Sequence, residues 1–523
     1  MKLLGYVSCF KKIAMILLLH GAAAQVWAHS TTITVLHTND IHGHLTPWIG
    51  WEGALSGRQI GGLDRMATAI KMVRREVGSA HTLLLDAGDT LGDSMIADET
   101  QGKAVIDAMN QMGYTAMVIG NHEPDFTAQI LRARIRDAKF PIIAANIIDQ
   151  ASGALFTQPY VIKQVQGIKI GILGLAYPNT PLTTVKKNIL GLTYLKAPEV
   201  ARDYLPKMRQ AGAQLIIVLS HYGLSADKKL AQQVPGIDVI VGGHSHNRMT
   251  QALTENGTLI VQAGAHGSDV GRLDLTLEQG KIVGSTHRLL TIDSQHYAPD
   301  PAVARVIKKA LTRHRATLTE AVGEAAGLIQ RAQTLAGQEA RKRDLESPAD
   351  SLFADMIQEA TQADVVFLPG IGYGTAILAG RISAADLRNL IPHHSKIITM
   401  TLSGQQISDI LEQSLENTYT EDTDKKVGGL VQVGGLRFKY RAVAAFGQRL
   451  TEVWVGAAPL DAQRTYRVAT NALLAEGGHR YRTFLDGKNP QEISSQYALI
   501  KAAFKKRATV EAPQPSRITR IDP

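Results

Sequence analysis

The stretch ITVLHTNDIHG at residues 33–43 decides the fold class, because an apolar run leads into side chains that can bind metal. The run Ile33–Leu36 has the length and composition of a buried strand, and Asp40 and His42 follow it. Amphipathic stretches such as 63–76 separate this run from further apolar runs downstream. The alternation indicates a layered α/β domain, whose functional residues gather at the carboxyl ends of the strands. The predicted buried strands are 33–36, 82–85, 116–119, 142–145, 168–173, 215–219 and 239–241.

Five clusters of polar residues each follow one of these predicted strands. If the strands are parallel, their carboxyl ends share one edge of the sheet and the clusters meet there. Histidine nitrogens, two carboxylates and an amide oxygen form a donor set that suits zinc, manganese, iron or cobalt. The clusters are Asp40-Ile41-His42, Gly88-Asp89, Gly120-Asn121-His122-Glu123, Ser220-His221 and Gly243-His244-Ser245-His246.

The number of candidate ligands indicates two metal ions, since seven ligands exceed the needs of one. Two ions about 3.5–4 Å apart hold the attacking and leaving oxygens of an in-line displacement and lower the pKa of a bridging water. Asp89, which follows Gly88, is the expected bridging carboxylate. Taken singly, each cluster also has a structural interpretation as a cap, a turn or a hydrogen-bonded histidine. Five clusters in order favour the metal centre.

The motifs LHTNDIHG at 36–43, DAGD at 86–89, GNHE at 120–123, SH at 220–221 and GHSH at 243–246 resemble those of a known family. They are similar to the calcineurin-like metallophosphoesterases and, within them, to the bacterial 5'-nucleotidase family. The resemblance implies a four-layer α/β/β/α catalytic domain followed by a mixed α/β C-terminal domain of the 5'-nucleotidase type. It also implies two divalent ions, with manganese, zinc, iron and cobalt as candidates. By this resemblance one ion would be held by Asp40, His42, Asp89 and His246, and the other by Asp89, Asn121, His221 and His244.

His122 is the predicted catalytic residue, because the family's histidine at this position faces the phosphate, and Asp125 matches its partner aspartate. An imidazolium beside the transferring phosphoryl group stabilises developing charge and protonates a leaving oxygen. A carboxylate on the far nitrogen fixes the tautomer. Asp125 has a second interpretation, as an acid that favours the dipole at a helix start. Pro124 departs from the aromatic residue often found there, but proline is compatible with a helix start.

The second half of the chain resembles the family's substrate domain and departs from it where a nucleoside would bind. The loop at 369–374 lacks the usual arginine and its bidentate grip on an anion. A leucine stands near the position of a stacking phenylalanine, and Pro392-His393 replaces the usual Pro-Phe. The predicted substrate-binding residues are Arg381, Arg388, Leu430 and Tyr481, the last as a stacking ring. His393, His394 and Arg480 are further candidate cations, with solvated loop residues as the alternative interpretation of all the charged ones.

The sequence therefore predicts a hydrolase of small phosphoester molecules, with nucleoside monophosphates or related nucleotides as the favoured class. A metal-bridging water would attack in line, and His122 would stabilise the transition state. Two alternatives stay open. A thiosulfohydrolase-like enzyme of the same family would cleave sulfate from a protein-bound cysteine conjugate, and a metal-dependent binder of phospho-ligands would not turn over. No basic face or known module indicates a nucleic-acid polymer as partner.

Composition and the N-terminal sequence predict an exported protein with two domains. Of 523 residues, 45% are apolar and 20% charged, as in soluble globular proteins. Lysines, a short apolar run and small residues before His29 predict a cleaved signal peptide, a periplasmic location and no membrane insertion after cleavage. Cys9 is the single cysteine, so the mature chain would have none. The predicted units are a signal peptide at 1–28, a catalytic domain at 29–298, a linker helix at 299–319, a C-terminal domain at 320–510 and a loosely held tail at 511–523.

Overall fold

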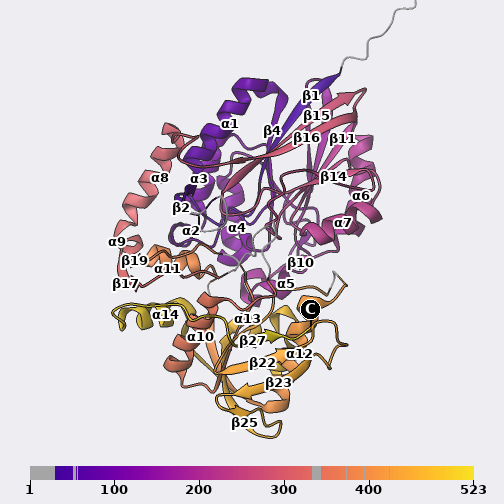
Figure 1. Cartoon of the computed structure of the whole chain (residues 1–523). Coiled ribbons are helices and arrows are strands. Elements are labelled where there is room, and N and C mark those ends of the chain that lie inside the picture. Colours follow the sequence, from indigo (N-terminus) through magenta and orange to yellow (C-terminus); the bar gives the residue numbers. More distant parts are fainter. Residues whose placement is uncertain are drawn as a thin grey trace, which may run out of the picture.

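The computed structural model describes residues 30–522 except 51–54, 56, 332–342, 373, 394 and 423–424. The first half of the chain, indigo to magenta in Figure 1, lies above the second half, which is orange to yellow. The predicted signal peptide and His394 lie outside the described residues, and the predicted domain boundaries stay predictions. Within the described part of the chain, no helix has both the length and the apolar character needed to cross a bilayer.

The first half contains two six-stranded sheets whose central strands are parallel. In the first sheet the order is β16-β15-β1-β4-β5-β6, and β1, β4, β5 and β6 run parallel. Its strands are β1 (Thr31–Thr38), β4 (Thr82–Asp86), β5 (Ala116–Val118), β6 (Ile142–Ile143), β15 (Asp269–Glu278) and β16 (Lys281–Thr291). In the second sheet the order is β13-β14-β12-β11-β9-β8, and β9, β11, β12 and β14 run parallel. Its strands are β8 (Tyr160–Val165), β9 (Ile168–Leu175), β11 (Leu215–Ser220), β12 (Val239–Gly242), β13 (Leu253–Glu255) and β14 (Thr258–Val261).

Alternation of side chains along the strands produces the predicted four layers. Val35 of the first sheet and Ile217 of the second share the apolar core between the sheets. Their neighbours Leu36 and Ile216 face outward and pack in two separate cores under helices. The helices are α1 (Leu63–Val77), α3 (Lys103–Met112) and α8 (Pro301–Arg313) outside the first sheet, and α6 (Ala197–Gln210) and α7 (Leu224–Gln233) outside the second. The α/β/β/α prediction is confirmed.

Smaller elements complete the first half and border the site. The helices are α2 (Met95–Thr100), α4 (Ala128–Asp137) and α5 (Thr180–Thr183), and a 3-10 turn spans Glu123–Phe126. Two short antiparallel pairs are β2 (Pro47–Ile49) with β3 (Gln59–Gly61), and β7 (Ile147–Asp149) with β10 (Leu192–Tyr194).

The predicted linker helix is present but is divided at His314 into α8 and α9 (Arg315–Leu318). Asp300 caps α8, because its side chain accepts hydrogen bonds from the backbone N–H groups of Ala302 and Val303. Pro301 occupies the first helical position, where its missing N–H costs nothing. Helix α8 packs against α1 and α3 of the first half, whereas α9 contacts α11 of the second.

The second half has a five-stranded sheet of order β21-β18-β25-β20-β26 and a four-stranded sheet of order β24-β23-β22-β27. A pair formed by β17 (Ala321–Ala325) and β19 (Gly380–Ser383) lies beside them. The larger sheet contains β18 (Val365–Leu368), β20 (Lys396–Ser403), β21 (Gln432–Gly434), β25 (Thr465–Asn471) and β26 (Lys488–Ser495). The smaller contains β22 (Leu436–Tyr440), β23 (Leu450–Val455), β24 (Ala458–Pro459) and β27 (Ile518–Arg520). The helices are α10 (Pro348–Thr361), α11 (Ala384–Leu390), α12 (Gly404–Tyr419), α13 (Ala472–Ala475) and α14 (Gln496–Lys505).

The prediction of a loosely held tail is wrong for its last part. Strand β27 pairs in parallel with β22 and so extends the smaller sheet. The backbone N–H of Arg517 donates to Glu346, and its guanidinium contacts Asp355 at 2.7 Å. These partners stand more than 150 residues away in sequence, so local composition gave no sign of the pairing.

Candidate active site

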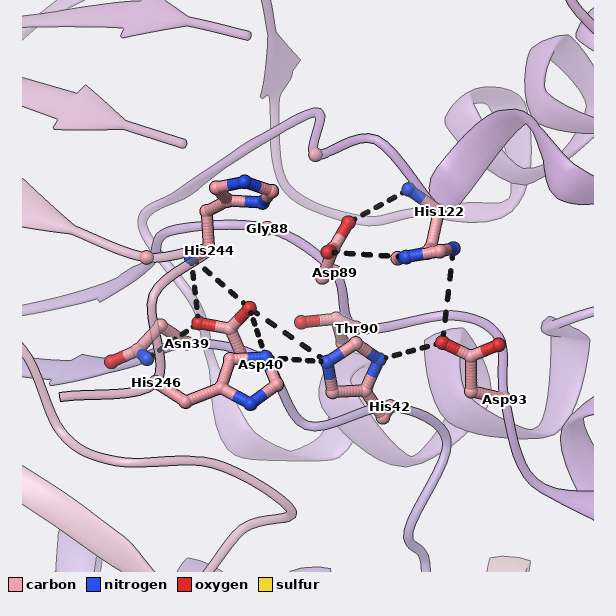
Figure 2. A network of polar contacts seen from close by, with 12 residues as sticks. Asn39, Asp40, His42, Gly88, Asp89, Thr90, Asp93, His122, His244 and His246 are labelled. Carbon is pink, nitrogen blue, oxygen red and sulfur yellow. Dashed lines mark hydrogen bonds and ion pairs between the residues drawn. The ribbon is translucent and has the colours of Figure 1, made fainter. Parts of the chain in front are cut away.

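The five predicted clusters lie together, but they come from two sheets rather than from one edge of a single sheet. Asp40, Asp89 and Asn121 follow β1, β4 and β5 of the first sheet. His221 and His244 follow β11 and β12 of the second. The backbone N–H of His244 donates to Asp40 Oδ2 at 2.9 Å, and His221 Nε2 lies 2.9 Å from Asp89 Oδ2. The carboxyl ends of both sheets therefore meet at a single site, and Figure 2 shows Asp40 and Asp89 of the first sheet beside His244 of the second.

Asp40, His42 and His246 form the first group whose ligand atoms point at a common position. These atoms all lie within 4.8 Å of one another, and the three side chains are buried. His42 Nε2 is 3.0 Å from His246 Nε2, which is 3.2 Å from Asp40 Oδ1 (Figure 2). Two imidazole nitrogens and a carboxylate oxygen aimed at one point are donors suited to a divalent transition metal.

Asp89, His221 and His244 form the second such group, with Asn121 beside it. His221 Nδ1 is 2.6 Å from the carbonyl oxygen of Ala87, so a proton on Nδ1 is donated there and Nε2 faces the Asp89 carboxylate. Burial opposes a charge on His221, but the Asp89 carboxylate outweighs burial and raises the pKa of His221 to about 10. A divalent cation bound beside Asp89 would neutralise the same negative charge of the carboxylate.

Asn121 supplies a direct test of whether these residues fit metal ions. Its side-chain oxygen Oδ1 is buried and accepts no hydrogen bond from any described residue. An unsatisfied buried acceptor costs about 1–3 kcal/mol, and coordination of a cation removes that cost. Together with the two groups of histidine and aspartate, this oxygen shows that the donor set fits two divalent ions.

His244 and His246 are held neutral, which is the form of imidazole that binds metal. Burial lowers the pKa of His246 to about 4 and holds the pKa of His244 well below its usual value. The Arg343 guanidinium of the second half adds to both shifts. The ring of Tyr177 stacks on His244 with centroids 4.1 Å apart and supports its orientation.

The site is built on strained backbone that the sequence did not predict. Five of the seven candidate ligands have left-handed conformations, namely Asp40 (φ 52°), His42 (φ 50°), Asp89 (φ 54°), His244 (φ 71°) and His246 (φ 57°). Such conformations cost of order 1 kcal/mol or more each for residues other than glycine, and they concentrate at functional sites. Gly88 shares this conformation (φ 86°), and a Cβ there would lie 2.8 Å from the Gly120 nitrogen. The ligand loops are therefore too close together for a larger residue at this position.

Glu123 ties two ligand loops together, a role that the sequence did not reveal. Its carboxylate accepts hydrogen bonds from the backbone N–H groups of Asp89, Thr90 and Gly120, at 3.0, 2.7 and 2.6 Å. The side chain is 1% exposed, so these bonds are shielded from water. Glu123 thereby fixes the loop that holds Asp89 against the loop that holds Asn121 and His122.

His122 stands next to the ligand groups and contacts Asp125 as predicted. His122 Nδ1 is 2.7 Å from Asp125 Oδ2, and Thr184 Oγ1 donates to the other oxygen of Asp125 at 2.8 Å. Burial opposes protonation, but the surrounding carboxylates, led by Asp93, hold the pKa of the His122 imidazole well above its usual value. His122 Nε2 lies 4.0 Å from Asp89 Oδ2, so this edge of the ring faces the ligand groups.

Asp93 is a site residue that sequence reasoning missed. Its Oδ2 is 2.8 Å from His42 Nδ1, and it lies between His42 and His122 in Figure 2. A carboxylate on Nδ1 fixes the tautomer in which Nε2 is available to a metal. The signal in the sequence is a second Gly-Asp pair, Gly92-Asp93, four residues after Gly88-Asp89.

A cleft of about 80 Å³ adjoins these groups and is lined by both halves of the chain. The first half contributes Asn121, His122 and Asp125 among others. The second half contributes Arg343, Pro369, Gly370, His393 and His479. A ligand bound there would contact the candidate metal ligands and the second half at the same time.

The four predicted substrate-binding residues do not line this cleft. Leu430 and Tyr481 are 0% and 1% exposed and pack in the apolar core of the second half. Arg388 is buried in an ion pair of 2.7 Å with Asp98, and Arg381 is exposed on β19. Of the further cations that the sequence suggested, His393 does line the cleft. Arg343 and His479 also line it and had not been assigned to it.

Comparisons with known proteins found matches for both halves of the chain. A family model described as calcineurin-like phosphoesterase matches residues 33–248, and one described as the 5'-nucleotidase C-terminal domain matches residues 321–486. The trifunctional nucleotide phosphoesterase YfkN of Bacillus subtilis is 27% identical over 92% of this chain, which spans 34% of that protein's length. Protein UshA of Yersinia enterocolitica is 26% identical over 94% of both chains.

Solved structures agree with this assignment. A 5'-nucleotidase precursor from Thermus thermophilus has a TM-score of 0.83 and 26% identity, and the match covers 94% of this chain and 100% of the other. The sulfate thiohydrolase SoxB from the same organism has a TM-score of 0.83 and 24% identity over 94% and 96% of the two chains, a likeness that shows the fold alone. The chain belongs to the calcineurin-like phosphoesterases that carry a 5'-nucleotidase C-terminal domain, and it is a hydrolase whose cofactors are two divalent metal ions.

Proposed function

We propose that the protein hydrolyses phosphomonoesters and that nucleoside monophosphates or related nucleotides are its substrates. The observation that carries this proposal is the position of the His122–Asp125 pair, which adjoins both groups of candidate metal ligands inside a cleft shared by the two halves. The names of the relatives, a nucleotide phosphoesterase and a 5'-nucleotidase precursor, support the same substrate class.

Two groups of side chains support the predicted assignment of the metal ligands. Asp40, His42, Asp89 and His246 would hold one ion, and Asp89, Asn121, His221 and His244 the other. When bound, two divalent ions act as Lewis acids on the phosphoryl oxygens and lower the pKa of a water. The chain itself supplies the strained loops that aim these donors and the buried surroundings that keep His244 and His246 neutral.

His122 supplies the positive charge that the chain brings to the reaction. Asp125 accepts a hydrogen bond from the Nδ1–H group of His122. The Nε2–H group is therefore directed at the ligand groups, where a phosphoryl oxygen would lie. A cation held there stabilises the charge that develops in the transition state and can transfer its proton to the leaving oxygen. Thr184 anchors Asp125 and thus fixes the direction of the imidazole.

The wall of the cleft favours an anionic ligand. Arg343 lines it, and burial together with the Arg343 guanidinium lowers the pKa of His479 to about 3. A guanidinium within such a buried pocket attracts phosphate oxygens. Binding of the phosphoester end of a substrate is therefore better supported by the geometry than binding of a base.

A second candidate function is cleavage of sulfate from a protein-bound cysteine conjugate, and a sulfate thiohydrolase is among the solved structures that share this fold. The observation in its favour concerns the side chains that line the cleft. Within the described part of the chain, this lining contains no phenylalanine, tyrosine or tryptophan ring to stack on a nucleobase.

Export to the periplasm is part of the proposal and rests on the N-terminal sequence. Residues 1–28 combine lysines, a short apolar run and small residues ahead of the expected cleavage point. N-terminal sequencing of the protein from the periplasmic fraction tests this, and a mature chain that retains Met1 would contradict it.

An assay of two products decides between the candidate functions. The purified protein, reconstituted with each of manganese, zinc, iron and cobalt, would be incubated with a panel of nucleoside monophosphates and a cysteine S-sulfonate peptide. We expect release of phosphate from the nucleotides. Release of sulfate alone would overturn the proposal in favour of the second candidate, and release of neither product would indicate a binder.

A further inference from the structure

Asp93 is a buried carboxylate held in a conformation that normally favours glycine. Its φ is 74° and its side chain is 4% exposed, in the loop between β4 and α2. A residue other than glycine in this region is strained, and such strain persists where surrounding contacts hold it. The side chain therefore makes contacts that compensate for its backbone.

The two oxygens of Asp93 face different parts of the chain. Oδ2 is 2.8 Å from His42 Nδ1 in the first half. Oδ1 is 3.4 Å from Nδ1 of His393, which follows α11 in the second half. His122 Nδ1 lies 3.8 Å from Oδ2, so Asp93 also approaches the predicted catalytic residue (Figure 2). One carboxylate thus joins a candidate ligand, the catalytic imidazole and the second half.

His393 covers the face of the His122 ring. The two ring centroids are 4.6 Å apart and the planes differ by 13°, which is a stacked arrangement. Asp125 and Asp93 both lie near Nδ1 of His122 and contact one edge of the ring. The stacked His393 ring covers one face of the imidazole and so restricts its rotation about the side-chain bonds. His393 follows α11 and so belongs to the second half, which means that this restriction exists only when the second half is docked on the first.

We propose that Asp93 and His393 are positioning residues that close the cleft and hold the His122 imidazole in its reactive orientation. The proposal rests on phosphoester hydrolysis by the same site. Contact between the halves then assembles the catalytic group, since His393 of the second half contacts both Asp93 and His122 of the first. The pair couples closure of the cleft to the position of the imidazole.

Three variants test the pair. His393→Phe keeps a ring that stacks on His122 but cannot contact Asp93, and His393→Ala removes both contacts. Asp93→Asn removes the charge while tolerating a left-handed backbone. At saturating metal, we expect Asp93→Asn and His393→Phe each to lower kcat about tenfold with KM changed less than about threefold, and the double variant to be no worse than either single one. His393→Ala should lower kcat further than His393→Phe.

A matched control separates this role from a general loosening of the two halves. Asp98 forms an ion pair of 2.7 Å with Arg388 across the same boundary, away from His122. Because Asp98→Asn leaves Arg388 buried without its carboxylate partner, it should weaken the docking of the two halves. We expect kcat to stay within about twofold of the unchanged protein, since the contacts of His122 are kept. An equal loss of kcat in Asp98→Asn, or losses that multiply in the double variant, would overturn the proposal.

A measurement independent of turnover distinguishes this proposal from the proposed function. Hydrogen–deuterium exchange of the metal-loaded protein should be faster at 391–396 in Asp93→Asn, although the substitution lies about 300 residues away in sequence. Metal content should stay at two ions per chain in His393→Phe, because His393 is not among the seven predicted ligands. Asp93→Asn also removes the carboxylate that contacts Nδ1 of the ligand His42, so this variant is compared at saturating metal. Unchanged exchange at 391–396 would overturn the closing role even if the protein hydrolyses phosphoesters. Absence of phosphate release from the unchanged protein would instead overturn the proposed function.

Discussion

Single residues at this site owe their charge to what surrounds them. His122 is buried and yet favours the protonated state, because the carboxylates of Asp89, Asp93 and Asp125 surround it. His244 and His246, only a few ångströms away from Asp40, favour the neutral state because burial dominates there. The same type of side chain is thus prepared for two tasks, stabilising charge and binding metal.

Replacement of His122 by Asn should remove catalysis and spare the metal ions. We expect kcat to fall by about 10²–10⁴, the usual contribution of a general acid. Metal content should not change, because His122 is not among the candidate ligands. Phosphate release and elemental analysis of the same preparation check this prediction. Survival of full activity would show that the role assigned to His122 is wrong.

Asp227 should make stability depend on pH. It is fully buried and accepts a hydrogen bond of 2.5 Å from Ser220 Oγ, and burial raises its pKa to about 8. The folded state keeps a proton that the unfolded state releases above about pH 4, so the free energy of unfolding falls as pH rises between about 4 and 8.

Asp227→Asn should therefore flatten this fall by up to about 1.4 kcal/mol per pH unit. Urea denaturation of the metal-loaded protein between pH 5 and 8 measures the slope. The exposed Asp203→Asn serves as the control and should leave the slope unchanged. Equal slopes in Asp227→Asn and the unchanged protein would contradict the prediction.

At the scale of elements, short strands deliver the ligands and tight loops aim them. Gly88 and Gly120 allow the loops after β4 and β5 to touch, and Glu123 binds the backbone of both. The loops are rigid because their polar groups are satisfied by one another, not because they belong to regular structure.

Gly120→Ala should displace Asp89, because the added Cβ would overlap its Oδ1 atom. We expect kcat/KM to fall by at least about 100-fold, since a shift of about 1 Å in a ligand is enough for such a loss. Gly284→Ala in β16 is a matched control, because its Cβ would meet Thr276 at an ordinary 3.7 Å. Phosphate release and metal content of the two variants would be compared. A fully active Gly120→Ala protein would show that the loops have more freedom than this geometry indicates.

For the whole molecule, the cleft belongs to neither half alone. The first half provides the candidate ligands and His122, and the second provides Arg343, His393 and His479. Helices α2 and α11 meet beside the cleft, where the Met95 N–H donates to Asn389 Oδ1 at 3.3 Å. Separation of the halves would open the cleft to substrate, with the connector α8–α9 at one side (Figure 1).

A disulfide between α2 and α11 should trap the closed form. The chain has a single cysteine, Cys9, so Met95→Cys with Asn389→Cys would add the only pair within the mature protein. We expect oxidation to lower kcat at least about tenfold and a reductant to restore it, because substrate and product must pass the opened cleft. Each single cysteine variant is a control. Unchanged turnover with the disulfide verified by mass would show that opening is not required.

Local sequence was sufficient to predict much of the first half of the fold. The predicted strands at 33–36, 82–85, 215–219 and 239–241 are present as β1, β4, β11 and β12, because apolar runs of this length are buried in almost any layered fold. The polar clusters follow at the strand ends, where side chains leave the sheet and are free to bind. The helix predicted at 63–76 is α1.

The substrate-binding residues were harder to predict from the sequence, because their positions depend on partners that are distant in sequence. Leu430 and Tyr481 are core residues because of how α12 and the larger sheet pack, which no local pattern reports. Asp93 is easily taken for a turn former until the fold places it between His42 and His393.

The sequence by itself indicated the α/β architecture and the polar clusters through a repeated strand-and-loop pattern, and its resemblance to a known family indicated the candidate ligands and the His122–Asp125 pair. The tertiary structure alone decided that the ligands come from two facing sheets, that β27 joins the smaller sheet, and that His393 covers His122. Those outcomes depend on packing and hydrogen bonds between segments up to hundreds of residues apart, whose free energy is shared among many side chains and is carried by no single motif.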